Sequence, residues 1–242
     1  MADYSVSPTG EKFPLPGPKE AAAEMKRLRT LVTKARARGQ EIVVVMGVGF
    51  VGAVMAAIVA DTVHKKGKDK GKSSKFVIGC QRPSPRSYWK IPMLNRGESP
   101  VKAEDPEVDE IVTRTVKSKK TLVATFNSDC LKLADCVVVD VQCDYAKQDL
   151  GDMRTGEADM AALEATMRTI GQRIQPKCLV LIETTVAPGT TRRVAGLIAV
   201  SRNCSGFISP RPLKRPTSMA SGLMPSRTSL SWIASSSSSS SA

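Results

Sequence analysis

The chain has 242 residues, 41% of them hydrophobic and 24% charged, so it can bury a core and has the composition of a globular protein. No apolar run approaches the length of a membrane span, and the N-terminus has no signal-peptide core, so we expect a cytoplasmic protein with no membrane partner. The net charge of +13 lies mainly in residues 65–75 and in the tail after Val200, with no interleaved aromatic residues, so no nucleic-acid partner is expected.

The start of the chain divides into two parts. Residues 1–17 are rich in proline, glycine and serine, and we predict a loose segment there. Residues 18–39 are rich in strong helix formers and end at Gly39, a typical helix stop, so they predict a leading helix.

From residue 40 on, short β-branched runs alternate with helical patterns. The runs predict strands at 41–46, 75–80, 121–126, 136–142 and 178–185. The helical patterns predict helices at 51–64, 105–120, 127–135, 159–174 (with Asp159 as N-cap) and 188–200. The lysine-rich stretch 65–75 is predicted to be a solvated loop. This alternation predicts an α/β fold over residues 18–200, a doubly wound parallel sheet of the Rossmann type.

Residues 201–242 differ in character from the rest. They contain no acidic residue and no helical or alternating pattern, and they close on a run of serines. A low-complexity segment of this kind does not bury a core, so we predict a disordered tail outside the domain.

The metal-binding residue types are few. Six cysteines form no C-x-x-C pair, and His64 is the only histidine, so no metal site is predicted. Several cysteines lie in apolar strand-like runs, which favours buried free thiols in a reducing compartment.

Three glycines follow the first predicted strand of the domain. Gly47, Gly49 and Gly52 have the G-x-G-x-x-G spacing between a strand and a helix, which is typical of a dinucleotide site. The first glycine permits a tight turn, the second lets backbone approach a pyrophosphate, and the third lets the helix pack close to the sheet. The alternative is a turn that only packs tightly.

The end of the next strand lacks the acidic residue that usually binds the adenosine ribose. Gln81 and Arg82 stand there instead. Glutamine can bond a ribose hydroxyl, and arginine can accept a 2′-phosphate. We therefore predict NAD as the cofactor and leave NADP open.

Four segments in order carry a resemblance to a known family. They are "GVGFVG", residues 90–106, "LADCVVVDV" and the run from Glu183 to Thr190, "ETTVAPGT". In these segments the chain resembles the N-terminal domain of the UDP-glucose/GDP-mannose dehydrogenase family, the nucleotide-sugar 6-dehydrogenases.

The resemblance implies a two-step, four-electron oxidation of a sugar 6-hydroxyl to a carboxylate with two NAD reduced. The substrate would be a nucleotide sugar, most simply a UDP-sugar, in a family whose members are commonly homo-oligomers. It assigns the pyrophosphate to residues of the glycine loop and the adenosine ribose to Gln81 and Arg82. The loop residues are Gly47, Gly49, Phe50, Val51 and Gly52. Glu183 and Thr184 are its candidate catalytic residues at the nicotinamide end, the alternative for Glu183 being a capping or surface carboxylate.

The chain also departs from the family pattern. Residues 141–152 replace a threonine-proline turn, and they place Cys143, Asp144 and Tyr145 where they could face the cofactor without an assigned role. The family's catalytic cysteine, which lies in a later domain, has no counterpart in this sequence. We therefore expect the chain alone to bind NAD without oxidising a sugar, with the tail as a shifted reading frame or the mark of a truncated gene. The alternative function is a non-catalytic dinucleotide-binding or regulatory module.

Overall fold

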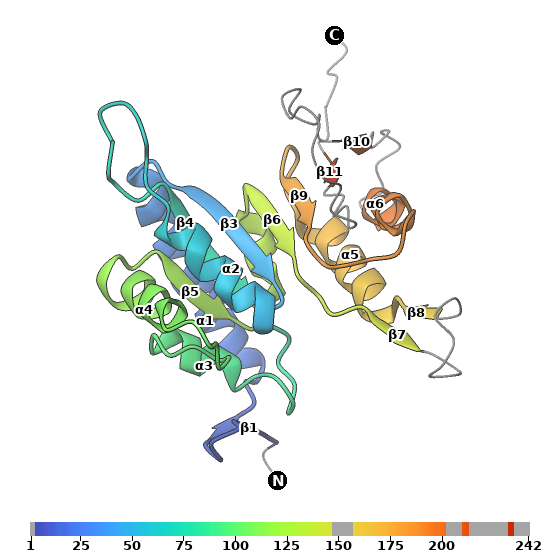
Figure 1. Ribbon diagram of the computed structural model, residues 1–242, viewed down its shortest axis with the longest axis horizontal. Coiled ribbons are helices and arrows are strands. Elements are labelled where there is room, and N and C mark those ends of the chain that lie inside the picture. Colours follow the sequence, from blue (N-terminus) through green and yellow to red (C-terminus); the bar gives the residue numbers. More distant parts are fainter. Residues whose placement is uncertain (1–2, 147–156, 202–209, 213–231, 235–242) are drawn as a thin grey trace, which may run out of the picture.

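The computed structural model describes residues 3–146, 157–201, 210–212 and 232–234, with side chains described over 3–143 and 159–201. Within this part, five parallel strands form the centre of a sheet in the order β5-β4-β3-β6-β9 (Figure 1). Their bounds are Glu41–Met46 for β3, Lys75–Cys80 for β4, Leu122–Thr125 for β5, Cys136–Val139 for β6 and Leu179–Ile182 for β9. The strand order runs outward from β3 in both directions, which confirms the predicted doubly wound sheet.

The two faces of the sheet are covered by different helices. One face packs against α1 (Pro18–Ala37), α5 (Ala161–Arg173) and α6 (Thr190–Ser201). The other packs against α2 (Phe50–Asp61), α3 (Lys90–Asn95) and α4 (Glu107–Thr113). The middle residues of β3 are buried throughout, as expected for a strand covered on both faces.

Two predicted helices take irregular forms. Helix α4 continues directly into a π-helical turn, η1 (Arg114–Ser118), so the predicted helix 105–120 is present in two segments. The short helix predicted at 127–135 is a 3-10 helix, η2 (Ser128–Leu133), which Asn127 caps by accepting the Asp129 N–H at 2.9 Å. Asp159 accepts the Ala161 N–H at 3.0 Å from two positions outside α5, one residue further out than an N-cap.

The prediction of a loose segment at 1–17 is wrong over most of its length. Strands β1 (Tyr4–Val6) and β2 (Lys12–Pro14) form an antiparallel hairpin. The hairpin is held in place by residues that lie more than eighty positions further along the chain. The buried Ser5 hydroxyl accepts the Trp89 N–H at 3.0 Å, and Arg96 binds Glu11 through both of its terminal nitrogens.

Besides the β1-β2 hairpin, four more short strands of the described part lie outside the set of parallel strands. β7 (Asp144–Ala146) and β8 (Glu157–Asp159) pair with each other. β11 (Trp232–Ala234) pairs antiparallel with β9, and β10 (Pro210–Pro212) pairs with β11. Beyond Ser201 only these last six residues of the tail are described. The prediction of a disordered tail therefore remains a prediction for the others, which lie outside the described residues.

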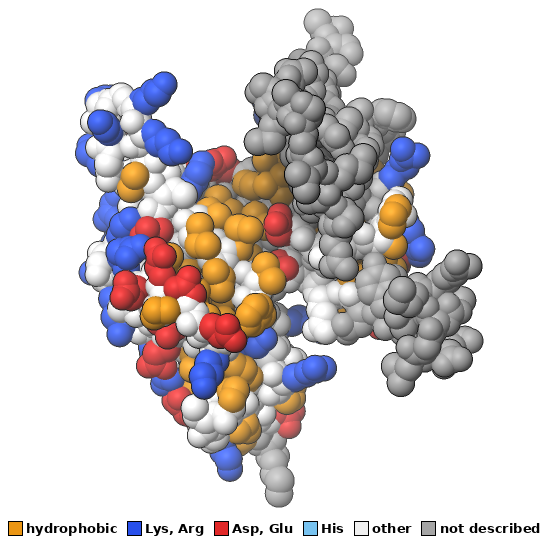
Figure 2. All heavy atoms as spheres, viewed as in Figure 1, with side chains coloured by type: hydrophobic (Ala, Val, Ile, Leu, Met, Phe, Trp, Pro, Cys, Tyr) orange, Lys and Arg blue, Asp and Glu red, His pale blue; other side chains and the backbone are white. Residues whose placement is uncertain are grey.

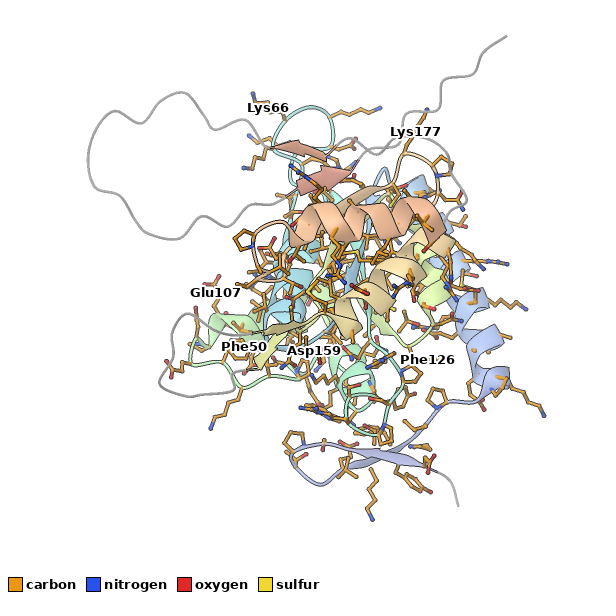
Figure 3. All side chains as sticks on the ribbon, turned by 90° about the vertical axis from the view of Figure 1, so that its right-hand side faces the viewer. Phe50, Lys66, Glu107, Phe126, Asp159 and Lys177 are labelled. Carbon is orange, nitrogen blue, oxygen red and sulfur yellow. The ribbon has the colours of Figure 1, made fainter. Side chains whose placement is uncertain are left out.

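The surface of the described part carries two notable features. Figure 2 shows hydrophobic side chains gathered over α2, where Val51 and Ile58 are each 50% exposed. The loop that carries Lys66 lies at the far end of the molecule from Phe50 (Figure 3). Cys80, Cys130 and Cys136 are buried free thiols, as predicted, Cys178 is buried too, and Cys204 lies outside the described residues.

No helix in the described part of the chain has the length and apolar character of a membrane span. Nor do the described residues contain a group of three histidine, cysteine or acidic side chains that could hold a metal ion.

Candidate dinucleotide site

A cleft of about 860 Å³ opens at the carboxyl ends of the parallel strands. Its walls come from the loop after β3, the loop after β4, the end of β6 and one side of α5. The chain reverses its winding direction between β3 and β6, and ligands of doubly wound sheets bind at such a switch point. Figure 3 shows three residues of its rim, Phe50, Phe126 and Asp159, at similar height in the molecule.

The glycine loop has the shape that its sequence predicts. Gly47 has φ of +98°, and a Cβ there would overlap the carbonyl oxygen of Asp140. A Cβ on Gly52 would overlap the carbonyl oxygen of Gly47 and lie 2.7 Å from Asp140 Oδ2. Both positions therefore exclude any side chain, because backbone atoms cannot move aside without moving the strand or the helix.

The middle glycine faces open space. A Cβ on Gly49 would meet no heavy atom within 4 Å, and Gly49 is the N-cap of α2 without a side-chain cap. The N–H groups of Gly49, Phe50 and Val51 have no acceptor among the described residues. Unpaired N–H groups at a helix N-terminus attract anions. The loop thus fits a pyrophosphate, which would supply the missing acceptors.

Asp140 is a residue of the site that the sequence analysis missed. It follows β6 and lines the cleft, and its Oδ2 lies 2.7 Å from the point that a Cβ on Gly52, in the first turn of α2, would occupy. Burial raises the pKa of Asp140, the nearby Gly52 N–H lowers it, and the charge of Glu183 raises it further. The signal was present in the sequence, because an acid directly after the four apolar residues of β6 must lie at the switch point.

Gln81 holds the glycine loop from the side. Its Oε1 accepts the N–H of the fully buried Val48 at 3.0 Å. Its own N–H bonds the carbonyl of Thr125 at 3.0 Å. Gln81 therefore lines the cleft, but its side-chain oxygen is already used within the protein.

One wall of the cleft is basic. It is formed by Arg82, Arg86 and Lys90, of which Lys90 is the first residue of α3. Burial lowers the pKa of Lys90, and the positive charge of Arg86 lowers it further.

Glu183 and Thr184 lie at the end of β9, next to the cleft but not among its lining residues. Their N–H groups both bond the carbonyl of Val139, at 2.9 and 3.2 Å. The Thr184 hydroxyl accepts the Val141 N–H at 3.0 Å and lies 2.8 Å from the Val141 carbonyl. Thr184 therefore joins the ends of β6 and β9, while the exposed Glu183 acts on the cleft through its charge on Asp140.

The residues of the unusual segment 141–152 are only partly described. Cys143 Sγ lies 3.6 Å from the carbonyl oxygen of Asp159 and does not line the cleft. The backbones of Asp144 and Tyr145 belong to β7, and their side chains lie outside the described part.

Comparison with known proteins gives a consistent picture. Residues 41–209 match the model described as "UDP-glucose/GDP-mannose dehydrogenase family, NAD binding domain". No curated protein matches the chain.

Solved structures provide further likenesses. The chain is 32% identical to an NDP-N-acetyl-D-galactosaminuronic acid dehydrogenase from Methanosarcina mazei Go1, over 72% of this chain and 33% of that one, with a TM-score of 0.56. GDP-mannose dehydrogenase from Pseudomonas aeruginosa, solved as a ternary complex, is 24% identical over 66% of this chain and 32% of that one, with a TM-score of 0.53. UDP-glucose dehydrogenase from Pyrobaculum islandicum is 24% identical over 67% of this chain and 33% of that one, with a TM-score of 0.52. The last two show the fold alone, and the chain spans about a third of the length of these proteins.

Proposed function

Because the chain belongs to the UDP-glucose/GDP-mannose dehydrogenase family, we propose that it binds NAD in this cleft for the oxidation of a nucleotide sugar. The observation that carries the proposal is the glycine loop. Its first and third glycines exclude side chains, its middle glycine faces open space, and three N–H groups have no acceptor in the described part of the chain.

The roles of the loop residues follow from their positions. The N–H groups of Gly49, Phe50 and Val51 would hold the pyrophosphate, helped by the partial positive charge at the N-terminus of α2. Gly47 and Gly52 would act by their shape, since they bring the turn and the helix close together. Gln81 would keep the loop in place, and Arg82 would lie at the ribose end.

We further propose that Glu183 and Thr184 belong to the nicotinamide end. Both follow β9, next to the switch point. The Thr184 hydroxyl already bonds the Val141 backbone, so its role would be to position the turn rather than to transfer a proton. The exposed carboxylate of Glu183 is free to order a water molecule or the sugar.

The proposed reaction oxidises the 6-hydroxyl of a nucleotide sugar to an aldehyde, which takes up a water molecule and is oxidised to a carboxylate, with protons released to solvent. NAD, when bound, accepts a hydride in each of the two steps. The relatives named above act on NDP-, GDP- and UDP-sugars, which supports this substrate class. The buried thiols are unsuited to covalent catalysis because their sulfur atoms are shielded from a substrate, and burial also raises the pKa of Cys136 to about 11. We therefore propose that the 242-residue chain by itself binds NAD but does not oxidise the sugar.

A titration with NADH, followed by its fluorescence, tests the first half of the proposal. We expect saturable binding that Gly49→Ala weakens at least tenfold. Gly196→Ala is the matched control, because Gly196 also faces open space but lies in α6, away from the cleft. No saturable binding by the folded wild-type chain would contradict the proposal.

The second half needs an activity measurement. The purified chain is mixed with NAD and with UDP-glucose, GDP-mannose or a UDP-N-acetylhexosamine, and NADH formation is followed. We expect none above the rate without sugar. Sustained NADH formation would show that the chain carries its own catalytic groups.

A further inference from the structure

The ribose end of the cleft contains three cations and lacks the usual acid. Arg82 and Arg86 are exposed and Lys90 is half-buried, and all three line the cleft. Where a ribose-binding carboxylate would stand, the chain has Gln81, whose Oε1 is bonded to Val48 at 3.0 Å. In a typical dinucleotide site, an acid at this position selects a ribose without a phosphate. In this chain an uncharged glutamine stands there, and positively charged side chains lie beside it.

These cations have no carboxylate partner among the described residues, although other arginines of the chain do. Lys90 Nζ lies over the Trp89 ring, 5.8 Å from its centroid. Seven other arginines of the described part form ion pairs: Arg27, Arg36, Arg96, Arg114, Arg168, Arg173 and Arg193. Arg29, Arg38 and Arg192 also form no ion pair in the described part of the chain, but they do not line the cleft. The cleft wall is therefore the place where unpaired arginines face a cavity.

The wall is also fixed in shape. The Ser87 hydroxyl lies 2.7 Å from that of Ser84 and donates to the Arg82 carbonyl at 3.2 Å. The Trp89 indole N–H donates to the Arg86 carbonyl at 3.1 Å. Backbone atoms of both arginines are therefore held, and Arg86 is close enough to Lys90 to disfavour its charged form. An anion between the three side chains would relieve this repulsion.

We infer that the wall formed by Arg82, Arg86 and Lys90 binds the 2′-phosphate of NADP, so that the chain accepts the phosphorylated dinucleotide at least as well as NAD. The inference rests on the proposed function and extends it to the choice of cofactor. Arginine is suited to the role because its planar fork binds two phosphate oxygens at once. Lys90 adds a third positive charge beside it.

The test compares NADPH and NADH, both followed by fluorescence titration of the whole chain at one fixed salt concentration. Wild type should bind NADPH as tightly as NADH or more tightly. Arg82→Gln/Arg86→Gln should weaken NADPH binding at least tenfold more than it weakens NADH binding, because it removes the charge-assisted hydrogen bonds that only a 2′-phosphate would receive. Arg29→Gln, an exposed arginine of α1, is the control for overall charge and should change neither.

A second variant keeps the hydrogen bond to Val48 and adds a negative charge at the ribose end. Gln81→Glu can still accept the Val48 N–H and places a carboxylate at the ribose end, so it should weaken NADPH binding selectively. If wild type binds NADH but binds NADPH more than tenfold more weakly, the inference is overturned and the proposed function stands. If the folded chain binds neither, the proposed function itself fails.

Discussion

Asp140 Oδ2, directly after β6, lies 2.7 Å from the point where a Cβ on Gly52, in the first turn of α2, would stand. The carbonyl of the same aspartate lies where a Cβ on Gly47 would stand. One residue directly after β6 thus lies against two of the three glycines. The loop is held by the next strand of the sheet as well as by its own turn.

Gly52→Ala should damage folding and binding together. The added methyl group would overlap the Gly47 carbonyl oxygen and approach Asp140 Oδ2, so the helix must shift away from the sheet. We expect a loss of about 1–3 kcal/mol in the free energy of unfolding, as for other overpacked sites. Denaturant unfolding and NADH titration measure the two effects.

Gly49→Ala provides the contrast. The position faces open space and has φ of −79°, so an alanine fits and stability should change by less than about 1 kcal/mol. NADH binding should nevertheless fall, since the methyl group occupies the approach of the pyrophosphate. Equal destabilisation by the two substitutions would contradict this account of the loop.

Asp140→Asn should stabilise the chain at neutral pH. Burial and Glu183 raise the pKa of Asp140, so its ionised form is disfavoured in the folded state. A raised carboxyl pKa contributes stability below the unfolded pKa of about 3.9, and this contribution is lost as the pH rises through the folded pKa. The asparagine keeps an oxygen for the Gly52 N–H and carries no charge. Thermal unfolding should therefore favour the variant at pH 7, with a difference that shrinks toward pH 4.

Glu183→Gln offers an independent check on the same pair. Removing the charge of Glu183 should also stabilise the chain at neutral pH. It should have no such effect in the Asp140→Asn variant, because residue 140 then carries no negative charge for Glu183 to repel. Additive effects would mean that the two carboxylates do not interact. A less stable Asp140→Asn variant at pH 7 would mean that the helix N-terminus needs the negative charge.

The glycine loop could be predicted from sequence because its determinants are contiguous. A buried strand, a turn and a small-residue helix follow one another between residues 41 and 61, and each carries its own local pattern. The five parallel strands were predictable for the same reason. Their β-branched runs are short, apolar and separated by helical segments.

The remaining features depend on pairs of residues that are distant in the chain. Asp140 meets Gly47 and Gly52 only because β3 and β6 are neighbours in the sheet. The hairpin at Tyr4–Pro14 is held by Trp89 and Arg96, which a local pattern does not reveal. Thr184 was predicted as a candidate catalytic residue, and its hydroxyl bonds the backbone of Val141, a contact that the sequence did not reveal.

Thr184→Val should destabilise the chain by about 1–2 kcal/mol, since the Val141 N–H would lose its acceptor at the end of β6. Thr184→Ser keeps the hydroxyl and should restore most of the loss. Thr185→Val is the control, because this neighbouring threonine is exposed. Denaturant unfolding gives the comparison, and equal effects at both positions would remove the role assigned to the Thr184 hydroxyl.

Asp61 fixes the other end of α2. Its carboxylate binds Arg114 through two bonds of 3.0 Å and lies 2.7 Å from Lys119 Nζ. The bond from Arg114 is the main reason that the pKa of Asp61 is lowered, and Lys119 lowers it further. A lowered carboxyl pKa contributes stability above the unfolded pKa of about 3.9, which is lost as the pH falls through the folded pKa.

Asp61→Asn should therefore reduce stability by about 1 kcal/mol at pH 7, a value kept small because the pair is partly exposed to solvent. The difference from wild type should disappear as the pH falls below about 4. Glu104→Gln removes an exposed carboxylate with no ion pair in the described part of the chain, and it should have no such effect. A pH-independent loss in Asp61→Asn would mean that the hydrogen bonds, and not the charge, hold the end of α2 to η1.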